Sequence, residues 1–356
     1  MKAAIRVRQS LRRAALVALK SSGAFHLVRG SSWRRQRLLI LCYHGVSVED
    51  EHAWRPALFI SPEQLERRLE ILQKGKYAVL PLAEGLERLR RNDLPPNSVA
   101  ITFDDGEYGF YRQAYPRLRK FGFPPTVYVT TYYSALRLPV FRLICSYMLW
   151  KVRDTNAFDL REVGVPEPVA LTSPETRQKA ADQIVQWADA QNITGVQKDG
   201  IAARLAELLK IDYQTLVGKR ILQLIHAEEV KELAEGGVDF QLHTHRHRSP
   251  LNEELFRKEI RDNRAQIAQT IPGIRTHFCY PSGAYRPEFL NWLRAEGVVS
   301  ATTCDTGFAT AQSNPLLLPR FVDTTGRSEI EFESWLNGIG HFLSLRRRAR
   351  PVYVPE

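Results

Sequence analysis

Short apolar runs that end abruptly in charged residues most restrict the fold of this chain. Ser98–Phe103 (SVAITF) is followed at once by Asp104-Asp105-Gly106, and Val238–Leu242 is followed at once by a histidine-rich segment. Runs this short and this apolar are typical of parallel strands that are buried on both faces. Segments with helical patterning separate them, which indicates strands connected through helices.

The alternation of strand-like and helix-like segments continues through most of the chain. A helix is expected to begin at Ser61-Pro62-Glu63, which offers a capping hydroxyl, proline at the first helical position and an acid in the first turn. Further strands are predicted at 38–43, 79–82, 126–131, 277–280, 298–303 and 316–321, and further helices at 82–91, 111–121, 227–235, 252–269 and 287–297. Together these elements predict a parallel sheet or barrel with helices on the outside.

The alternation is interrupted between about residues 133 and 220, where helix signals occur without a convincing strand. This pattern predicts a helical insertion on one strand-to-helix connection, a position where barrels place lids over substrate. The predicted organisation comprises a basic N-terminal arm (1–37), a first part of the barrel (38–132), a helical insertion or lid (133–225), a second part of the barrel (226–340) and a basic C-terminal tail (341–356).

The net charge of +11 is carried by the two ends of the chain. Residues 1–37 contain ten Lys or Arg residues and no acid, and four arginines lie near the other end. In the body between them, basic and acidic residues nearly balance. The body has no basic stripe with interleaved aromatic residues, so no nucleic-acid partner is expected.

The N-terminal arm suggests contact with a surface rather than passage across a membrane. Its apolar run 14–19 is too short for a secretory signal, and no stretch of the chain has the ~18–20 apolar residues that span a bilayer. The arm could form a basic amphipathic helix on an anionic membrane surface, or it could be solvated and disordered. Four widely spaced cysteines without a CxxC pair favour thiols in a reducing compartment. We therefore expect a cytoplasmic protein that is peripheral at the inner membrane face.

Two adjacent carboxylates, Asp104 and Asp105, stand where the predicted strand 98–103 ends. They repel each other, and burying both is costly unless a cation or a proton is shared. A turn formed by Asp-Asp-Gly without any chemistry is the alternative interpretation.

The segment HTHRH at 243–247 follows another predicted strand. In a continuous strand His243 and His247 would be ~13 Å apart, whereas two imidazoles on one metal each lie ~2.0–2.1 Å from it. The chain must therefore curl after His243 if both residues are to bind one metal, and His245 would then point elsewhere. A solvated turn is again the alternative.

These segments resemble the motifs of the polysaccharide deacetylase family (carbohydrate esterase family four). TFDDG at 102–106 is similar to the first motif, HTHRH at 243–247 fits the second, H-[S/T]-x-x-H, and YPSG at 280–283 is similar to the third. Tyr43-His44-Gly45 also resembles the first strand of bacterial members. The resemblance covers about residues 38–325 apart from the insertion, and it implies a distorted (β/α) barrel of about seven strands.

The resemblance implies a metal-dependent hydrolase that removes N-acetyl or O-acetyl groups from a polysaccharide, an oligosaccharide or a lipid-linked glycan. Asp105, His243 and His247 would bind the metal, with zinc expected first and cobalt, nickel, manganese or iron(II) as alternatives. Asp104 would act as the general base, and the backbone N–H of Ser282 would face the developing oxyanion. The metal would lower the pKa of its water towards ~7.

The chain departs from the family pattern in two places. Many members have an arginine in the third motif and an aromatic residue after its proline, where this chain has Cys279 and Ser282. The late Leu-x-Leu-His motif, which supplies the catalytic acid, is not evident, and His341 is a poor match for it. Further candidates for substrate contact lie at strand ends: Tyr280, Pro281, Asp305 and Arg320.

Two other functions remain open from the sequence. A non-haem iron oxygenase also uses two histidines and one carboxylate, and a catalytically silent carbohydrate-binding or assembly protein would tolerate degraded motifs. Asp104 favours the hydrolase, because a hydrolase needs a base beside the metal.

Overall fold

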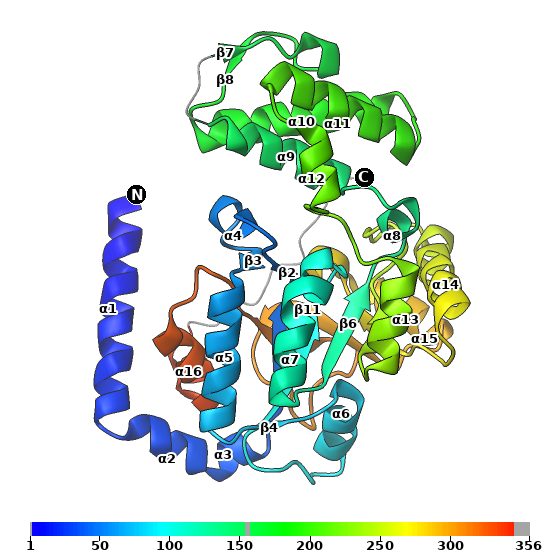
Figure 1. Cartoon of the computed structure of the whole chain (residues 1–356). Helices are drawn as coiled ribbons and strands as arrows, with labels where there is room; N and C mark the ends of the chain where they lie inside the picture. Colours follow the sequence, from blue (N-terminus) through cyan, green and yellow to red (C-terminus); the bar gives the residue numbers. More distant parts are fainter. Residues whose placement is uncertain (1, 154–156, 345–356) are drawn as a thin grey trace.

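The computed structural model describes residues 2–153 and 157–344, and for residues 2–9 it describes only the backbone. Within these residues one sheet contains eight parallel strands, and seven of them close into a barrel (Figure 1). The barrel strands follow one another in the order β1, β12, β11, β10, β9, β6 and β5, and β4 pairs with the first two residues of β5. Their bounds are β1 (Leu39–Tyr43), β4 (Ala78–Val79), β5 (Ser98–Phe103), β6 (Pro125–Val129), β9 (Asp239–Leu242), β10 (His277–Cys279), β11 (Ser300–Thr306) and β12 (Leu318–Val322). The predicted barrel of about seven strands is confirmed.

The barrel closes because β1 and β5 pair along their full apolar length. The register runs in parallel from Leu39 opposite Val99 to Tyr43 opposite Phe103. Every residue of both strands is buried, as expected for strands covered on both faces.

Helices cover the outside of the barrel and begin at the predicted signals. Ser61 caps α5 by accepting a hydrogen bond from the backbone of Gln64 at 3.2 Å, and Pro62 opens the helix. The other outer helices are α6 (Leu82–Arg90), α7 (Tyr115–Phe121), α13 (Ala227–Glu235), α14 (Glu253–Thr270), α15 (Pro287–Ala295) and α16 (Glu329–Asn337), while α5 spans Pro62–Lys74 and a π-helical turn spans Phe110–Ala114.

A helical lobe stands beyond the carboxyl ends of the strands (Figure 1). Its helices are α9 (Phe141–Lys151), α10 (Pro174–Ala190), α11 (Gly195–Leu209) and α12 (Tyr213–Gly218), and α8 (Tyr132–Leu136) leads into it. It has a hydrophobic core of its own. The sequence predicted no strand here, but Ala157–Phe158 and Val169–Ala170 form a small antiparallel pair, β7 and β8. Two residues per strand are too few to produce a detectable alternation.

The lobe rests on the segment that follows β1, which contains β2 (Gly45–Val46), α4 (Glu51–Trp54) and β3 (Phe59–Ile60). The ring of Tyr147 on α9 lies edge-on to Trp54, with centroids 5.4 Å apart. Lys151 on the same helix forms an ion pair with Asp50 at 2.8 Å. The lobe is therefore anchored next to the mouth of the barrel.

The N-terminal residues form helices that pack against the barrel wall: α1 (Lys2–Ser21), α2 (Ala24–Gly30) and α3 (Ser32–Arg35). Arg34 is fully buried, and its guanidinium donates to the carbonyls of Leu336, Arg37 and Ser98. The alternative of a disordered arm is therefore wrong for the described part of this segment. None of the helices described is long and apolar enough to cross a bilayer. The predicted basic tail lies mostly outside the described residues, which end with α17 (Ile339–Leu343) and Ser344.

Candidate active site

The carboxyl ends of β5 and β9 bring an aspartate and two histidines together at one edge of the barrel. Oδ1 of Asp105 lies 3.1 Å from Nε2 of His243 and 3.2 Å from Nε2 of His247. The centroids of the two imidazole rings are 4.9 Å apart. Parallel strands of one barrel end at the same rim, so residues more than 130 positions apart in the sequence meet here.

Left-handed backbone conformations turn these side chains toward one another. The φ angles are 69° at Asp105, 62° at Thr244 and 54° at His247. Such conformations are uncommon for non-glycine residues and gather at functional sites. Oγ1 of Thr244 accepts a hydrogen bond from the backbone of Arg248 at 3.1 Å, which stabilises the curl after His243. The curl lets both histidines face one carboxylate.

Asn263 on α14 fixes the position of the first histidine. Its Oδ1 accepts a hydrogen bond from the backbone N–H of His243 at 3.0 Å. Its Nδ2 donates to the carbonyl of Val129 and to Oγ1 of Thr131, both at 3.0 Å. Because Asn263 is fully buried, it ties the end of β9 to the end of β6 without competition from water.

Glu259, one turn earlier on α14, binds the segment that follows His243. Its buried carboxylate accepts hydrogen bonds from the backbone of Arg246 at 2.8 Å and from Nε of Arg248 at 2.7 Å. The ring of His245 turns away from Asp105, because its Nδ1 lies 2.8 Å from Oγ1 of Thr131.

In the neutral ring of His243 the proton is on Nδ1, and Nε2, which faces Asp105, has none. Nδ1 lies 2.8 Å from the carbonyl oxygen of Cys279, which can only accept, so Nδ1 carries a proton. Nε2 of the neutral ring then presents a lone pair to a carboxylate oxygen at 3.1 Å. Two acceptors this close repel each other unless the ring is doubly protonated or a cation lies between them.

When no cation is bound, the imidazole of His243 is protonated on both nitrogens and carries the positive charge. Burial would lower the pKa of His243, but Cys279 and Asp105 raise that pKa well above its usual value. The pKa of Asp105 is correspondingly lowered, because His247 and His243 outweigh its burial.

The residues present fit a divalent metal ion. One carboxylate oxygen and two imidazole nitrogens lie within 4.8 Å of one another. This donor set suits transition metals and leaves positions open for water and substrate. Nearby Glu107 is also buried, and burial together with the charges of Asp105 and Glu51 raises its pKa well above the usual value. The surroundings therefore favour an added positive charge.

Asp104 is held on the other side of the same turn by Arg320 on β12. The guanidinium contacts both carboxylate oxygens of Asp104 at 2.7 Å. Its remaining N–H groups reach the carbonyl of Thr303 at 3.0 Å, Oγ1 of Thr102 at 3.2 Å and Sγ of Cys279 at 3.1 Å. All five N–H groups of this buried arginine therefore have partners.

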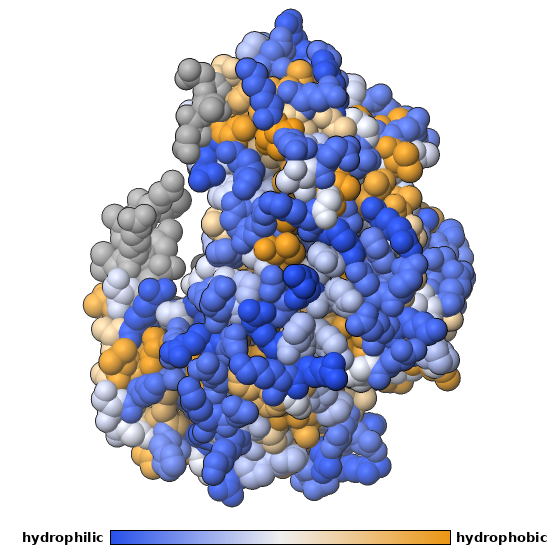
Figure 2. Space-filling model, in the orientation of Figure 1, coloured by the Kyte–Doolittle hydropathy of each residue, from blue (hydrophilic) through white to orange (hydrophobic). Residues whose placement is uncertain are grey.

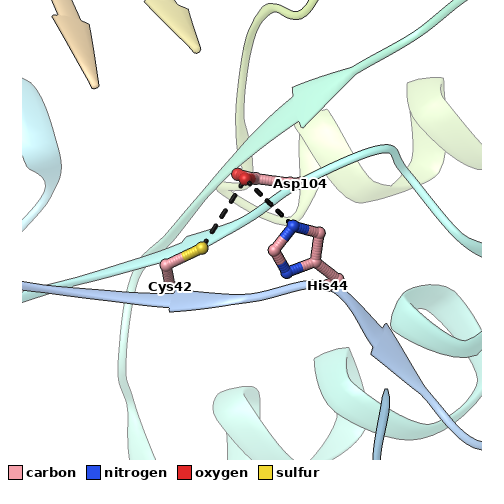
Figure 3. A group of neighbouring side chains, drawn as sticks. All are labelled: Cys42, His44 and Asp104. Atoms are coloured by element: carbon pink, nitrogen blue, oxygen red, sulfur yellow. Dashed lines mark hydrogen bonds and ion pairs between the residues drawn. The ribbon is translucent and has the colours of Figure 1, made fainter. Parts of the chain in front are cut away.

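Two thiols and a histidine complete the surroundings of Asp104. Sγ of Cys42 lies 3.5 Å and Sγ of Cys279 lies 3.4 Å from Oδ2 of Asp104. Nε2 of His44 lies 3.6 Å from the same oxygen, and Figure 3 shows the imidazole and the Cys42 thiol both pointing at the carboxylate. Burial raises the pKa of the Cys42 thiol well above its usual value, so this group stays protonated and can donate.

The charge state of Asp104 follows from these contacts. Burial would raise the pKa of this carboxyl, but the charge and hydrogen bonds of Arg320 lower it below its usual value. Asp104 is therefore ionised at neutral pH and fixed in orientation, next to Asp105 in the chain.

Three of the residues predicted to contact substrate are buried in the structure, so the prediction of substrate contact is wrong for them. Tyr280 is fully buried, and its hydroxyl donates to the carbonyl of Leu316 at 3.1 Å. Pro281 is buried in the following 3₁₀ turn. Arg320 is also fully buried and binds Asp104. The sequence placed these residues at strand ends, but a side chain there can also point into the packing between the strands and the outer helices, as Tyr280 does, or into the barrel, as Arg320 does.

The other predicted residues lie in different places. Ser282 occupies the 3₁₀ turn after β10 with a φ of 56°, and Asp305 on β11 has Oδ2 3.5 Å from the hydroxyl of Tyr285. His341 packs against the ring of Trp33, with centroids 5.2 Å apart. Trp33 belongs to α3, whose Arg34 binds the first residue of β5, so His341 lies at the opposite end of the barrel.

Sequence reasoning did not assign roles to His44, Asn263 or the pairing of Arg320 with Asp104. His44 follows a buried strand, as Asp104 does, and this shared position was the available signal. Asn263 lies inside a helix pattern and carries no such signal.

The fold and the site define a parallel (β/α) barrel with a two-histidine, one-carboxylate centre and a second, ionised carboxylate beside it. A family model described as polysaccharide deacetylase matches residues 91–140 and 211–301, on either side of helices α9–α11 of the lobe. Through these two segments the chain is similar to the polysaccharide deacetylase family.

Individual relatives match shorter segments. The chain is 28% identical over 99 residues to the poly-β-1,6-N-acetyl-D-glucosamine N-deacetylase of Escherichia coli (strain K12), covering 28% of this chain and 14% of that protein. It is 33% identical over 72 residues to the enzyme of the same name from Staphylococcus aureus (strain MSSA476), covering 20% of this chain and 25% of that protein. The matches thus span a quarter or less of these relatives.

A solved structure shares the fold over most of the chain. The deacetylase PplD of Streptococcus pyogenes, in complex with acetate, superposes with a TM-score of 0.54 at 19% identity, covering 82% of this chain and 94% of that one.

Proposed function

We propose that this protein is a metal-dependent hydrolase that removes N-acetyl or O-acetyl groups from a glycan. The observation that carries the proposal is the position of Asp104, an ionised and rigidly held carboxylate adjacent in sequence to the metal-binding Asp105. The match to the polysaccharide deacetylase family model and the named activity of the two relatives support the same reaction class.

The cluster of Asp105, His243 and His247 is the proposed metal site. Zinc is the first candidate, with cobalt, nickel, manganese and iron(II) as alternatives, since all accept imidazole and carboxylate ligands. A bound divalent metal supplies Lewis acidity, which favours ionisation of water and polarises a carbonyl group.

Asp104 is the proposed general base. It takes the proton of the attacking water at a carboxylate oxygen. Arg320 holds both oxygens of Asp104 in a fixed position during this proton transfer. Because the guanidinium favours the ionised form, Asp104 is ready to accept a proton at neutral pH. The backbone N–H of Ser282 remains the proposed donor to the developing oxyanion.

His44 is the proposed proton donor to the leaving amine. It lies beside Asp104 with a side chain that is 17% exposed, so a group bound at the rim can reach it. His341 cannot take this role, because it lies at the opposite end of the barrel.

The substrate class is proposed from the relatives, whose names specify an N-acetylated glucosamine polymer. We propose an N-acetylated polysaccharide, oligosaccharide or lipid-linked glycan for this protein. Asp305, which is partly exposed on β11, is the remaining predicted residue that could contact it.

Release of acetate from N-acetylglucosamine oligomers tests the proposal. The protein would be stripped of metal with a chelator, reloaded separately with each candidate metal, and assayed with and without oxygen. We expect acetate release that needs metal and does not need oxygen. Oxygen consumption coupled to substrate would identify an oxygenase, and glycan binding without turnover in every metal form would identify a silent binding protein.

Two neighbouring substitutions separate the base from the metal ligands. Asp104→Asn should retain metal and lose turnover by ~10²–10⁴-fold, the usual contribution of a general base. Asp105→Asn should lose metal as well. Unchanged deacetylation by the Asp104→Asn protein would refute the proposed base.

A further inference from the structure

Between Ser10 and Ser21, α1 has one face without a charged residue, bordered by the exposed side chains of Arg13 and Lys20. Leu16 is fully buried against α2 and α17, and Arg12 and Leu19 lie on the same inward side. Leu11 and Val17 point outward and are 65% and 53% exposed. The other residues of this uncharged face are Ser10, Ala14, Ala15, Ala18 and Ser21.

Arg13 and Lys20 lie at the border of this face, with side chains that are 49% and 52% exposed, and each also reaches an acid on α16. Lys20 forms an ion pair with Glu333 on α16, and Nε of Arg13 lies 3.8 Å from Glu331 on the same helix. These contacts set the rotation of α1 about its axis. An uncharged, partly apolar strip is therefore held facing away from the body.

Further exposed apolar side chains lie on two helices that pack next to α1. Leu27 on α2 and Phe342 and Leu343 on α17 are also exposed, and both helices pack together next to α1. With Leu11 and Val17 they make five of the eleven large hydrophobic side chains that are exposed in the described part of the chain. Figure 2 shows hydrophobic residues along this edge of the molecule, over α1. We call these five residues the apolar edge.

The charge of the surrounding sequence indicates what covers the apolar edge. Residues 1–37 contain ten Lys or Arg residues, of which Arg34 is buried, and no acid, and the sequence continues after α17 with Arg346, Arg347, Arg348 and Arg350. Apolar side chains set among cations are the composition of helices that lie in the interface of an anionic membrane. A cytosolic protein partner or a second copy of this chain would not need this excess of positive charge, and a second copy would bring the same charges together.

We infer that the apolar edge docks on an anionic lipid surface, with α1 lying in the plane of the membrane. The apolar side chains enter the interface while the half-exposed cations at the border of the face, Arg13 and Lys20, meet lipid phosphates. In Figure 1, α1 runs alongside the barrel wall, on the outer side of α16 and α5, and not across the mouth of the barrel. Docking by this wall leaves the carboxyl ends of the strands, with Asp105 and His243, uncovered. The inference does not depend on the reaction proposed above.

Vesicle co-sedimentation of the full-length protein tests the inference. We expect binding to phosphatidylcholine vesicles that contain phosphatidylglycerol, weaker binding at high salt, and little binding to phosphatidylcholine alone. The double variant Leu11→Glu and Val17→Glu should bind the anionic vesicles at least about tenfold more weakly, because it loses two apolar side chains that the lipid would cover and gains two charges that the lipid repels.

A matched control uses exposed hydrophobic residues elsewhere. Ile274→Glu and Val196→Glu make the same kind of change on exposed residues far from α1 in the sequence, so this pair should bind like the unaltered protein. Circular dichroism and thermal melting establish that both double variants are folded. Equal vesicle binding by the two double variants would overturn the inference. The inference would also be overturned if the unaltered protein did not bind vesicles and instead formed a dimer in light scattering that the α1 double variant does not form.

Discussion

Arg320 and Asp104 form a buried pair in which each guanidinium Nη atom lies 2.7 Å from a different carboxylate oxygen. The two residues stand on β12 and at the end of β5, and β1 lies between these strands in the barrel. A buried ion pair is tolerable only when its geometry is good and its other polar atoms are satisfied. Here the guanidinium has five partners, so the pair holds the proposed base in one orientation.

The pair of Arg320 and Asp104 bears on the place where the third motif of this chain departs from the family pattern. Where many family members have an arginine, this chain has Cys279, and Sγ of Cys279 contacts Nη2 of Arg320 at 3.1 Å. A compact thiol leaves space for a guanidinium that arrives from another strand. The carbonyl of the same cysteine orients His243, so Cys279 contacts both the proposed base and a proposed metal ligand.

Arg320→Lys should reduce kcat by about 100-fold while leaving metal content unchanged. Lysine presents a point charge and cannot hold two carboxylate oxygens at once, so Asp104 would lose its orientation. Steady-state kinetics and metal analysis check this. Arg68→Lys is the matched control, because Arg68 also forms a buried pair, with Asp323 at 2.9 Å. It should lower stability without a comparable effect on kcat, and an equal loss of kcat in both variants would argue that Arg320 acts only through folding.

Asn263→Ala should weaken metal binding by about 10–100-fold, as is typical when a group that orients a metal ligand is removed. The backbone of His243 would lose its partner, and the carbonyl of Val129 would lose a donor. A competition titration with a coloured chelator measures the affinity. Asn291→Ala, on the exposed side of α15, serves as the control. If excess metal failed to restore activity to a folded Asn263→Ala protein, the residue would have a role beyond placing the ligand.

His44→Gln should lose amide hydrolysis much more than ester hydrolysis. An amine must be protonated to leave, whereas the phenolate of an aryl acetate leaves readily without an acid. We expect kcat for N-acetylglucosamine oligomers to fall by about 100-fold or more, with turnover of an aryl acetate within a fewfold of the unaltered protein. Parallel losses on both substrates would exclude His44 as the donor.

Glu296→Gln should destabilise the protein at neutral pH and much less in acid. Burial would raise the pKa of Glu296, but its bonds to Arg257 and Arg261 lower that pKa below the usual value. A carboxyl with a lowered folded pKa contributes stability above its unfolded pKa of ~4.3, and this contribution is lost as the pH falls through the folded pKa. Urea unfolding at pH 7 and at about pH 3.5 should therefore show a smaller difference between the two proteins at the lower pH. A difference that is constant with pH would assign the effect to packing.

The strands, the outer helices and the residues at strand ends could be read from the sequence, because those signals are local. Ser98–Phe103 is apolar throughout and becomes β5 with the predicted bounds, and Ser61 caps its helix as expected. Parallel strands of a barrel end at one rim, so the meeting of Asp105 with His243 and His247 followed from where each strand ends.

Only the tertiary structure decided which strand-end side chains point into the barrel and which point to its rim. Tyr280 and Arg320 are equally plausible rim residues in the sequence, yet one fills the core and the other binds Asp104. The direction of a side chain depends on the register and tilt of strands whose partners lie hundreds of residues away, as with Leu41 and Phe321. Local sequence patterns contain no information about that register, so the partners of Asp104 could be found only once the barrel had closed.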